Sequence, residues 1–158
     1  MKRNTQFLLG INRMLKLHET MLKSVCGKYG LTVVETEIVS FLWNNPGKDT
    51  ATDIVELRML SKGCVSKAVE SLIRKGCLIR TQDSSDRRIQ HLQLTEKTAS
   101  VTGEIDRLQE ELWEILLSGF DSGEVSLFEQ FMDRMFDNIR DASELTSSVS
   151  VQNTSLQL

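Results

Sequence analysis

The stretch of residues 75–95 constrains the fold of this chain more than any other segment. Two runs rich in strand-forming residues, 78–81 and 89–94, alternate polar and apolar side chains in part as strands do. Between them, residues 83–87 (Asp-Ser-Ser-Asp-Arg) have the polar composition that tight turns favour. The stretch therefore predicts a two-stranded hairpin with basic side chains at its tip.

An amphipathic helix is predicted directly before the hairpin, over residues 62–75. Ser61 is a suitable N-cap, and one face of the helix is apolar, carrying Val65, Val69, Leu72 and Ile73 at helical spacing. The opposite face is polar and basic. Gly76 is expected to end the helix and lead into the hairpin.

A shorter helix is predicted before this one, opened by the capping pair Thr50 and Asp53. Its inward residues are expected to be Ala51, Ile54 and Val55. A tight connection at residues 58–60 joins the two helices. Two short helices joined in this way form a helix-turn-helix, and the hairpin makes it a winged one, a unit that grips DNA.

Long helices flank this unit. One covers residues 5–26 and another begins near Thr32, each with an apolar stripe, and the sequence from Asn44 through Pro46-Gly47 ends the second. After the hairpin, Thr95 is expected to cap a heptad-spaced helix, and Asp121 with Glu124 to cap a last one. These helices expose more apolar surface than a small core can cover, which predicts a homodimer; the alternative is a monomer that folds them back on itself.

The charge is distributed unevenly along the chain, although the formal net charge is only −3. Residues 58–94 carry eight Lys and Arg against three Asp and Glu, whereas residues 95–158 carry four against thirteen. The basic block coincides with the helix and the hairpin. This separation favours a polyanion partner such as DNA, with a solvated basic surface as the alternative.

Composition restricts the remaining classes of protein. No apolar run approaches the roughly 18 residues of a membrane span, and the polar start is no signal peptide, so a cytoplasmic protein without membrane contact is expected. Three cysteines without CxxC spacing and two distant histidines predict neither a disulfide framework nor a metal site. Without paired catalytic carboxylates, a nucleophile elbow or a phosphate loop, no enzyme and no cofactor are expected.

The chain resembles the MarR family (multiple antibiotic resistance regulators) of transcription factors. The resemblance spans roughly residues 5–142 and rests on the helix sequence of residues 61–76, the Leu-Ile-Arg that follows at 78–80, the Asp-Arg-Arg of residues 86–88 and the Leu-Gln-Leu-Thr of residues 92–95. It departs from the family at Ser85, where many members have arginine, at Thr98, where glycine is common, and at Arg58-Met59, which replaces a glycine-containing turn.

The resemblance implies a mainly α fold with a β-hairpin wing and long N- and C-terminal dimerisation helices. The implied divisions are a dimerisation helix at 1–30, the winged helix-turn-helix at 31–95, dimerisation helices at 96–142 and a disordered tail at 143–158. Contacts to double-stranded DNA with a pseudo-palindromic operator would come from Ser61, Lys62, Gly63, Ser66, Lys67, Arg87 and Arg88. Arg88 would enter the minor groove, supported by Asp86, and Arg87 would touch phosphate.

Such a regulator, usually a repressor, responds to a small aromatic or phenolic effector or to cysteine oxidation. His18, on the apolar stripe of the first helix, could line an effector pocket, and otherwise is a partly buried packing residue. Cys64, near the start of the 62–75 helix, is the candidate for oxidation, and otherwise a small half-buried residue. A winged-helix module that binds an acidic protein is the competing function.

Overall fold

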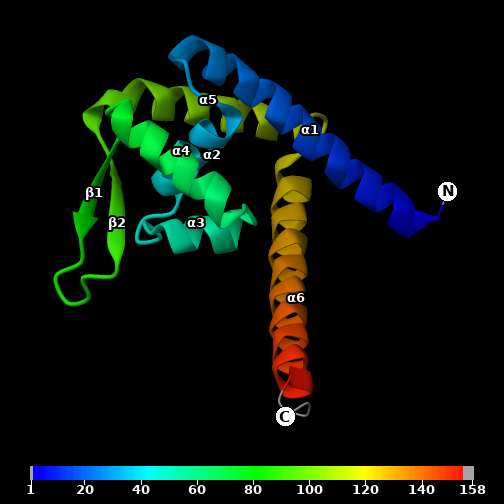
Figure 1. The fold of residues 1–158 in the computed structure, drawn as a ribbon. Coiled ribbons are helices and arrows are strands. Elements are labelled where there is room, and N and C mark those ends of the chain that lie inside the picture. The colour runs from blue at the N-terminus through cyan, green and yellow to red at the C-terminus, as the bar shows by residue number, and fades with distance from the viewer. Residues whose placement is uncertain (1, 155–158) are drawn as a thin grey trace. The chain divides into compact units, whose positions relative to one another are not determined.

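The computed structural model describes residues 2–154, with the side chains of residues 2–143, and confirms a mainly helical fold with one hairpin (Figure 1). The helices are α1 (Arg3–Tyr29), α2 (Val33–Asn44), α3 (Ala51–Arg58), α4 (Lys62–Arg74), the short 3-10 helix η1 (Glu96–Thr98), α5 (Ala99–Leu116) and α6 (Ser122–Thr154). The strands are β1 (Leu78–Gln82) and β2 (Gln90–Leu94). The chain divides into two compact units, Met1–Trp113 and Glu114–Leu158.

Capping boxes begin α2 and α3. The Thr32 hydroxyl accepts a hydrogen bond from the Glu35 amide at 3.2 Å, while the Glu35 carboxylate accepts one from the Thr32 amide at 2.7 Å. Thr50 and Asp53 make the same pair of bonds at 3.2 and 3.0 Å, as the sequence predicted. Each box satisfies backbone N–H groups that the first turn of a helix leaves without a partner.

The core of the first unit gathers the inner faces of α1 to α5 and of the hairpin. Its most buried members come from every one of these elements and include Leu22, Ile38, Ile54, Val65, Leu72, Leu78, Leu92 and Ile105. The C-terminal half of α1 and the first half of α5 are therefore part of this unit's own core. The Lys28 ammonium also donates to the Glu104 carboxylate of α5, at 2.6 Å.

Lys75 anchors the end of α4 to the start of α2. Its ammonium donates to the Glu35 carboxylate at 2.7 Å and to the Gly30 carbonyl at 2.8 Å. The Glu35 side chain is only 2% exposed. Burial is the largest single effect and acts to raise the pKa of Glu35. The hydrogen bonds from Lys75, Ser71 and the Thr32 amide, with the charge of Lys75, together outweigh it, so the pKa lies below its ordinary value. These bonds thus keep a buried carboxylate charged and paired.

The hairpin has the antiparallel register that places one face on the core. Leu78 pairs with Leu94 and Arg80 with Leu92, and both Leu78 and Leu92 are buried. The strands differ by one residue from the sequence prediction, because β1 extends to Gln82 and β2 begins at Gln90. The turn between them therefore covers residues 83–89.

The structure differs from three local predictions made from the sequence. The Thr95 hydroxyl does not cap a helix; it donates to the Gly76 carbonyl at 2.7 Å, and η1 precedes α5. Ala51 is exposed rather than inward, because the N-terminal turn of α3 leaves the core before Ile54 enters it. The tail expected from residue 143 is helical as far as Thr154, since Ser and Thr cost a helix only a few tenths of a kcal/mol each. Residues 155–158 lie outside the described part of the chain.

The second unit is built on α6. The Asp121 carboxylate accepts from the Glu124 amide at 3.0 Å, and the Glu124 carboxylate accepts from the Asp121 amide at 2.9 Å, which forms the predicted capping box. Large apolar side chains are exposed along the helix, among them Leu127, Phe131, Phe136 and Ile139. Among the described helices, none is long and apolar enough to cross a membrane.

The turn between α3 and α4 contains a testable irregularity. Met59 takes the left-handed conformation with φ 53° and ψ 32°, and its side chain is 93% exposed. This conformation costs an L-residue about 1–2 kcal/mol because of its Cβ, and glycine, which has no Cβ, avoids that cost. Met59 therefore occupies a position suited to glycine, at the point where the sequence departs from the MarR family pattern.

We expect Met59→Gly to stabilise the fold by about 0.5–1 kcal/mol, because relief of the left-handed strain exceeds the extra chain entropy of glycine. Urea unfolding would show a higher midpoint with an unchanged m-value. Glu56→Gly, at an exposed position inside α3, is the matched control and should destabilise by about 1 kcal/mol. A lower midpoint for Met59→Gly would contradict the assigned strain.

Candidate nucleic-acid interface

Burial of one face of α4 in the core fixes the orientation of the helix, so that its opposite, polar face is exposed. Val65, Val69 and Leu72 are at most 2% exposed. Lys62, Gly63, Ser66 and Lys67, the residues expected to contact DNA, are all exposed on the other side. The Ser61 hydroxyl accepts from the Cys64 amide at 3.2 Å and so caps the helix. The packing of α4 thus turns a basic helical face and its positive N-terminus outward.

A side-chain pair joins the same helix to the wing. The Arg80 guanidinium of β1 donates to the Glu70 carboxylate of α4 at 2.6 Å. Both side chains are partly exposed, so the pair is worth little in stability. Its effect is geometric, because it holds the first strand of the wing beside the polar face of α4.

Asp83 organises the turn of the wing. One of its carboxylate oxygens accepts three hydrogen bonds, from the Ser85 amide at 2.7 Å, the Ser85 hydroxyl at 2.6 Å and the Asp86 amide at 2.8 Å. These bonds lower the pKa of Asp83 far below its ordinary value, and the hydrogen bond from the Ser85 hydroxyl has the largest effect. Ser85, where the family often has arginine, therefore serves to close the turn.

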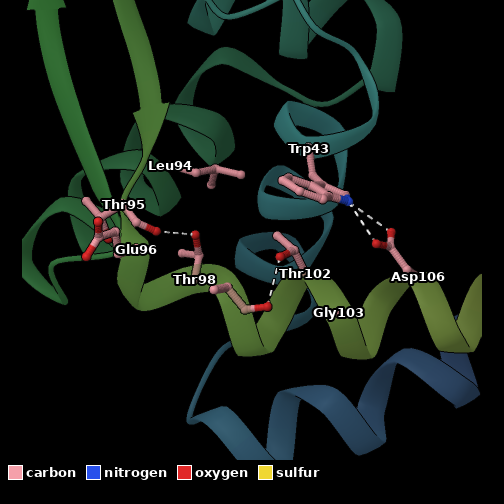
Figure 2. A pocket seen from close by; sticks show the side chains of 9 residues that line it. Trp43, Leu94, Thr95, Glu96, Thr98, Thr102, Gly103 and Asp106 are labelled. Carbon is pink, nitrogen blue, oxygen red and sulfur yellow. Dashed lines mark hydrogen bonds between the residues drawn. The ribbon is translucent and has the colours of Figure 1, made fainter.

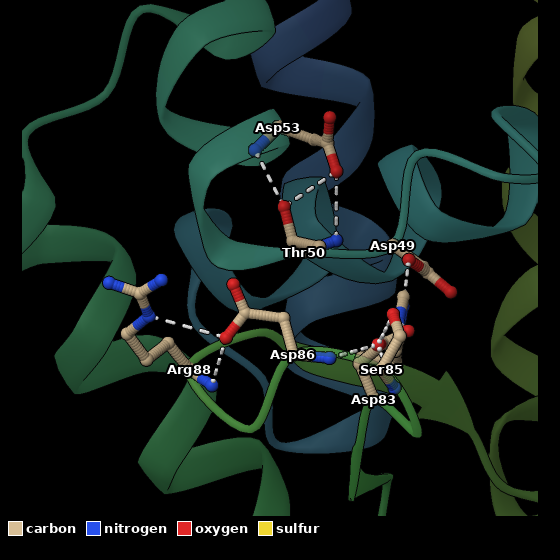
Figure 3. A network of polar contacts seen from close by, with 8 residues as sticks. Asp49, Thr50, Asp53, Asp83, Ser85, Asp86 and Arg88 are labelled. Atoms are coloured by element: carbon tan, nitrogen blue, oxygen red, sulfur yellow. Dashed lines mark hydrogen bonds and ion pairs between the residues drawn. The ribbon is translucent and has the colours of Figure 1, made fainter.

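The wing tip presents two arginines in different settings. Asp86 accepts from the Arg88 amide at 2.9 Å and from its Nε at 3.3 Å (Figure 3). The Arg88 side chain is 92% exposed, so it is guided by Asp86 but not covered. The Arg87 carbonyl accepts from Gln82 at 2.7 Å, and the Arg87 side chain is exposed. The structure thus brings Asp86 to Arg88, while the contact of Arg88 with DNA stays a prediction.

His91 fastens the wing to the segment before α3. One ring nitrogen lies 2.7 Å from an Asp49 oxygen and the other 3.1 Å from the second oxygen of Asp83. The backbone adds to this join, since the Leu92 amide donates to the Asp49 carbonyl at 2.7 Å and Thr50 forms a β-bridge with His91. Figure 3 shows Asp49 and Asp83 in this network, with Thr50 nearby; the two carboxylates contact the His91 ring rather than each other.

Sequence reasoning missed this histidine. Asp49 and His91 are 42 residues apart, and no local pattern connects them. An aspartate just before a capping residue and a histidine within a strand are the only signals, and both are ordinary. Only the tertiary fold reveals that the wing has a second point of attachment.

The side chains of the two residues expected to sense signals take no part in the wing contacts described above. His18 is half-buried on α1, and burial, followed by the charge of Arg58, lowers its pKa. Cys64 is half-buried in the first turn of α4. Cys26 lies 3.3 Å from the Thr36 hydroxyl, and Cys77 is buried. The sensing roles of His18 and Cys64 stay predictions.

A short helix pair whose second helix exposes a basic face, followed by an arginine-tipped hairpin, defines a winged helix-turn-helix protein. Residues 29–89 match the model of the MarR family. The transcriptional regulator AdcR of Streptococcus pyogenes is 25% identical over 118 residues, covering 73% of this chain and 79% of that protein. The similarity to the MarR family model thus covers α2, α3, α4 and β1, and the relative is a transcriptional regulator.

Solved structures show the same fold. A MarR transcriptional regulator from Methanosarcina mazei superimposes with a TM-score of 0.74 at 21% identity, over 86% of this chain and 98% of that one. A putative MarR family regulator from Listeria monocytogenes, solved with a 26mer DNA, gives 0.72 at 19% identity, over 85% and 89%. These structures agree with the predicted winged helix.

The stability contributed by the contacts of His91 with Asp49 and Asp83 should depend on pH. Only the protonated ring can donate from both nitrogens, and the hydrogen bonds to Asp49 first and Asp83 second raise the pKa of His91 above 6.5. Asp53 of α3 adds a further negative charge nearby, with Lys48 next to it. The stability from these bonds is therefore complete below pH 6.5 and is lost as pH rises through the higher folded pKa of His91.

We expect the two histidines to titrate on opposite sides of 6.5 in an NMR titration, His91 above and His18 below. Asp49→Asn should move the His91 midpoint down and leave His18 unchanged, because it removes one of the two carboxylate partners. A His91 midpoint at or below that of His18 would contradict the bridged geometry.

Proposed function

We propose that this chain is a cytoplasmic homodimer that represses transcription by binding a pseudo-palindromic operator, with an affinity modulated by a small effector. The observation that carries the proposal is the joint placement of two basic elements on one unit. The exposed face of α4 suits the major groove, and the wing holds Arg88 beside it through Asp86. Ser61, Lys62, Gly63, Ser66 and Lys67 would meet the bases and phosphates at α4.

The dimer is supported by apolar side chains that the described chain leaves exposed. In the first unit, Phe7, Leu8 and Leu15 on the N-terminal half of α1 are each more than half exposed. In the second unit, Phe131, Phe136 and Ile139 of α6 are likewise more than half exposed. Surfaces of this kind are the usual material of a homodimer interface. Two copies would present two α4 helices to successive half-sites.

Modulation by an effector follows from the MarR resemblance, which implies a small aromatic ligand. Its support in this chain is a cavity of about 420 Å³ in the first unit, beside the connection between the wing and α5. A volume of this size suits a small molecule. His18 is not among the residues that line it.

Arg88→Ala is expected to weaken operator binding by on the order of 1–3 kcal/mol, the size of a good specific contact. Asp86→Asn should also weaken it, although it removes a negative charge, because Asp86 positions the Arg88 guanidinium. Fluorescence anisotropy with a labelled operator selected from random DNA would measure both effects, and size-exclusion chromatography should show an unchanged dimer.

Arg140→Ala is the matched control for this pair, because Arg140 lies on α6, outside the basic block, and pairs with Asp137. It should leave operator affinity nearly unchanged. Full operator affinity in Arg88→Ala would refute the wing assignment. Binding of an acidic protein by the α4 face, with no operator bound, would favour the protein-interaction module instead.

Salt dependence separates the two wing arginines. Each neutralised phosphate contributes a slope of about −0.9 to log K against log salt. Arg87→Ala should weaken all DNA sequences alike and reduce the magnitude of this slope by about 1, since its proposed contact is with phosphate. Repeating the anisotropy titrations at several salt concentrations gives the slope. A flat response in the unmodified protein would contradict DNA binding altogether.

A further inference from the structure

The cavity in the first unit is lined by residues from three segments of the chain. It lies where the end of α2, the segment after β2 and the first turns of α5 meet (Figure 2). Its lining consists of Trp43, Leu94, Thr95, Glu96, Thr98, Ala99, Thr102, Gly103 and Asp106. All three elements belong to the same compact unit.

An indole ring provides its aromatic surface. Trp43 is 48% exposed, and its Nε1 donates to both oxygens of Asp106 at 2.9 and 3.0 Å. Figure 2 shows the ring above α5 with Asp106 at its nitrogen end. The hydrogen bonds fix the orientation of the ring and place a carboxylate at its edge. A flat apolar group can stack on the indole while a cation meets that carboxylate.

The side-chain donors of the lining are already engaged by the protein. Besides the indole N–H, the hydroxyls of Thr95, Thr98 and Thr102 donate to the carbonyls of Gly76, Thr95 and Ala99 at 2.6–3.0 Å. What remains for a ligand is a set of acceptors, namely the carboxylate oxygens of Glu96 and Asp106 and the hydroxyl lone pairs. These side chains therefore favour a ligand that brings its own donors.

The charge of the lining also favours a ligand that carries donors and a positive charge. Within the described residues, the lining contains two carboxylates and no Lys, Arg or His. The neighbouring cations are occupied elsewhere: the Lys97 ammonium donates to the Lys75 carbonyl at 2.7 Å, and Arg107 pairs with Glu104 at 2.8 Å. An anion in this cavity would have no cationic side chain of the lining as a partner, whereas an ammonium could pair with a carboxylate at either end, Asp106 or Glu96.

We propose that this cavity binds a small organic cation with a flat apolar part, an aryl-alkyl amine in its simplest form, and that this cation is the effector. The effector role rests on the proposed function. The inference specifies a cationic effector, whose charge is opposite to that of a phenolic anion. Because the walls connect the wing to α5, an occupied cavity would favour one arrangement of these elements and so change operator affinity.

Three probes that share one skeleton test the charge: 2-phenylethylamine, 2-phenylethanol and phenylacetate. Isothermal titration calorimetry on the full chain should show the amine binding at least about tenfold more tightly than the alcohol, and the anion not binding. Asp106→Asn should weaken the amine about tenfold. Glu111→Gln, a carboxylate on α5 outside the lining, is the matched control and should not change it.

A blocking variant tests the location. Gly103 is exposed, and a Cβ there would meet no heavy atom within 4 Å beyond its own stretch of helix, so Gly103→Leu places a larger side chain at the lining. It should abolish amine binding while circular dichroism shows an unchanged fold. Unchanged binding in this variant, binding of phenylacetate as tight as that of the amine, or no binding of the amine would each overturn the proposal.

Operator anisotropy with and without the amine separates this inference from the proposed function. A shift in operator affinity that Gly103→Leu removes supports the effector role. Amine binding with unchanged operator affinity would overturn that role, while loss of operator binding in the ligand-free protein would refute the proposed function instead.

Discussion

The arrangement of this protein depends on the burial of one face of α4. Val65, Val69 and Leu72 enter the core with α2 and α3, and this fixes which residues of the helix face outward. Lys75 completes the anchoring by pairing with the buried Glu35. If the helix were rotated by a quarter turn in one direction, Ala68 would replace Lys67 at its surface. The basic face is therefore a consequence of packing.

The wing depends on a different kind of interaction, a chain of charged hydrogen bonds with little apolar burial. Asp83 closes the turn, Asp86 guides Arg88, and His91 joins the hairpin to Asp49. A two-stranded hairpin is marginal by itself in water. The buried Leu78 and Leu92 hold its base, and the carboxylate contacts hold its tip. Wing geometry is consequently more sensitive to charge and pH than α4 is.

Two groups of carboxylates in the first unit have separate roles. The carboxylates beside the wing are engaged with Ser85, Arg88 and His91, so they order a surface whose outer charge is basic. The carboxylates of the cavity, Glu96 and Asp106, line a concave space next to an indole. Net charge along the sequence does not distinguish these uses, because it does not report what each carboxylate faces.

The sequence by itself determined the elements of the winged helix. The apolar spacing of α4, the capping pair at Thr50 and Asp53 and the turn composition after β1 are local signals, and each carries its own physical cause. Local signals failed at Thr95, whose hydroxyl bonds to Gly76 across the base of the hairpin, and at Ala51, which packing leaves exposed. They also failed beyond residue 143, where polar residues continue α6.

Only the tertiary structure decided which distant residues meet. The contact of His91 with Asp49, of Lys75 with Glu35 and of Trp43 with Asp106 each spans 40 or more residues. Such contacts arise from the way helices and hairpin pack around one core, and periodicity carries no information about them. The sequence therefore determined the helices and strands of the winged helix, whereas the fold decided which face of α4 is exposed, how the wing is fastened and what lines the cavity.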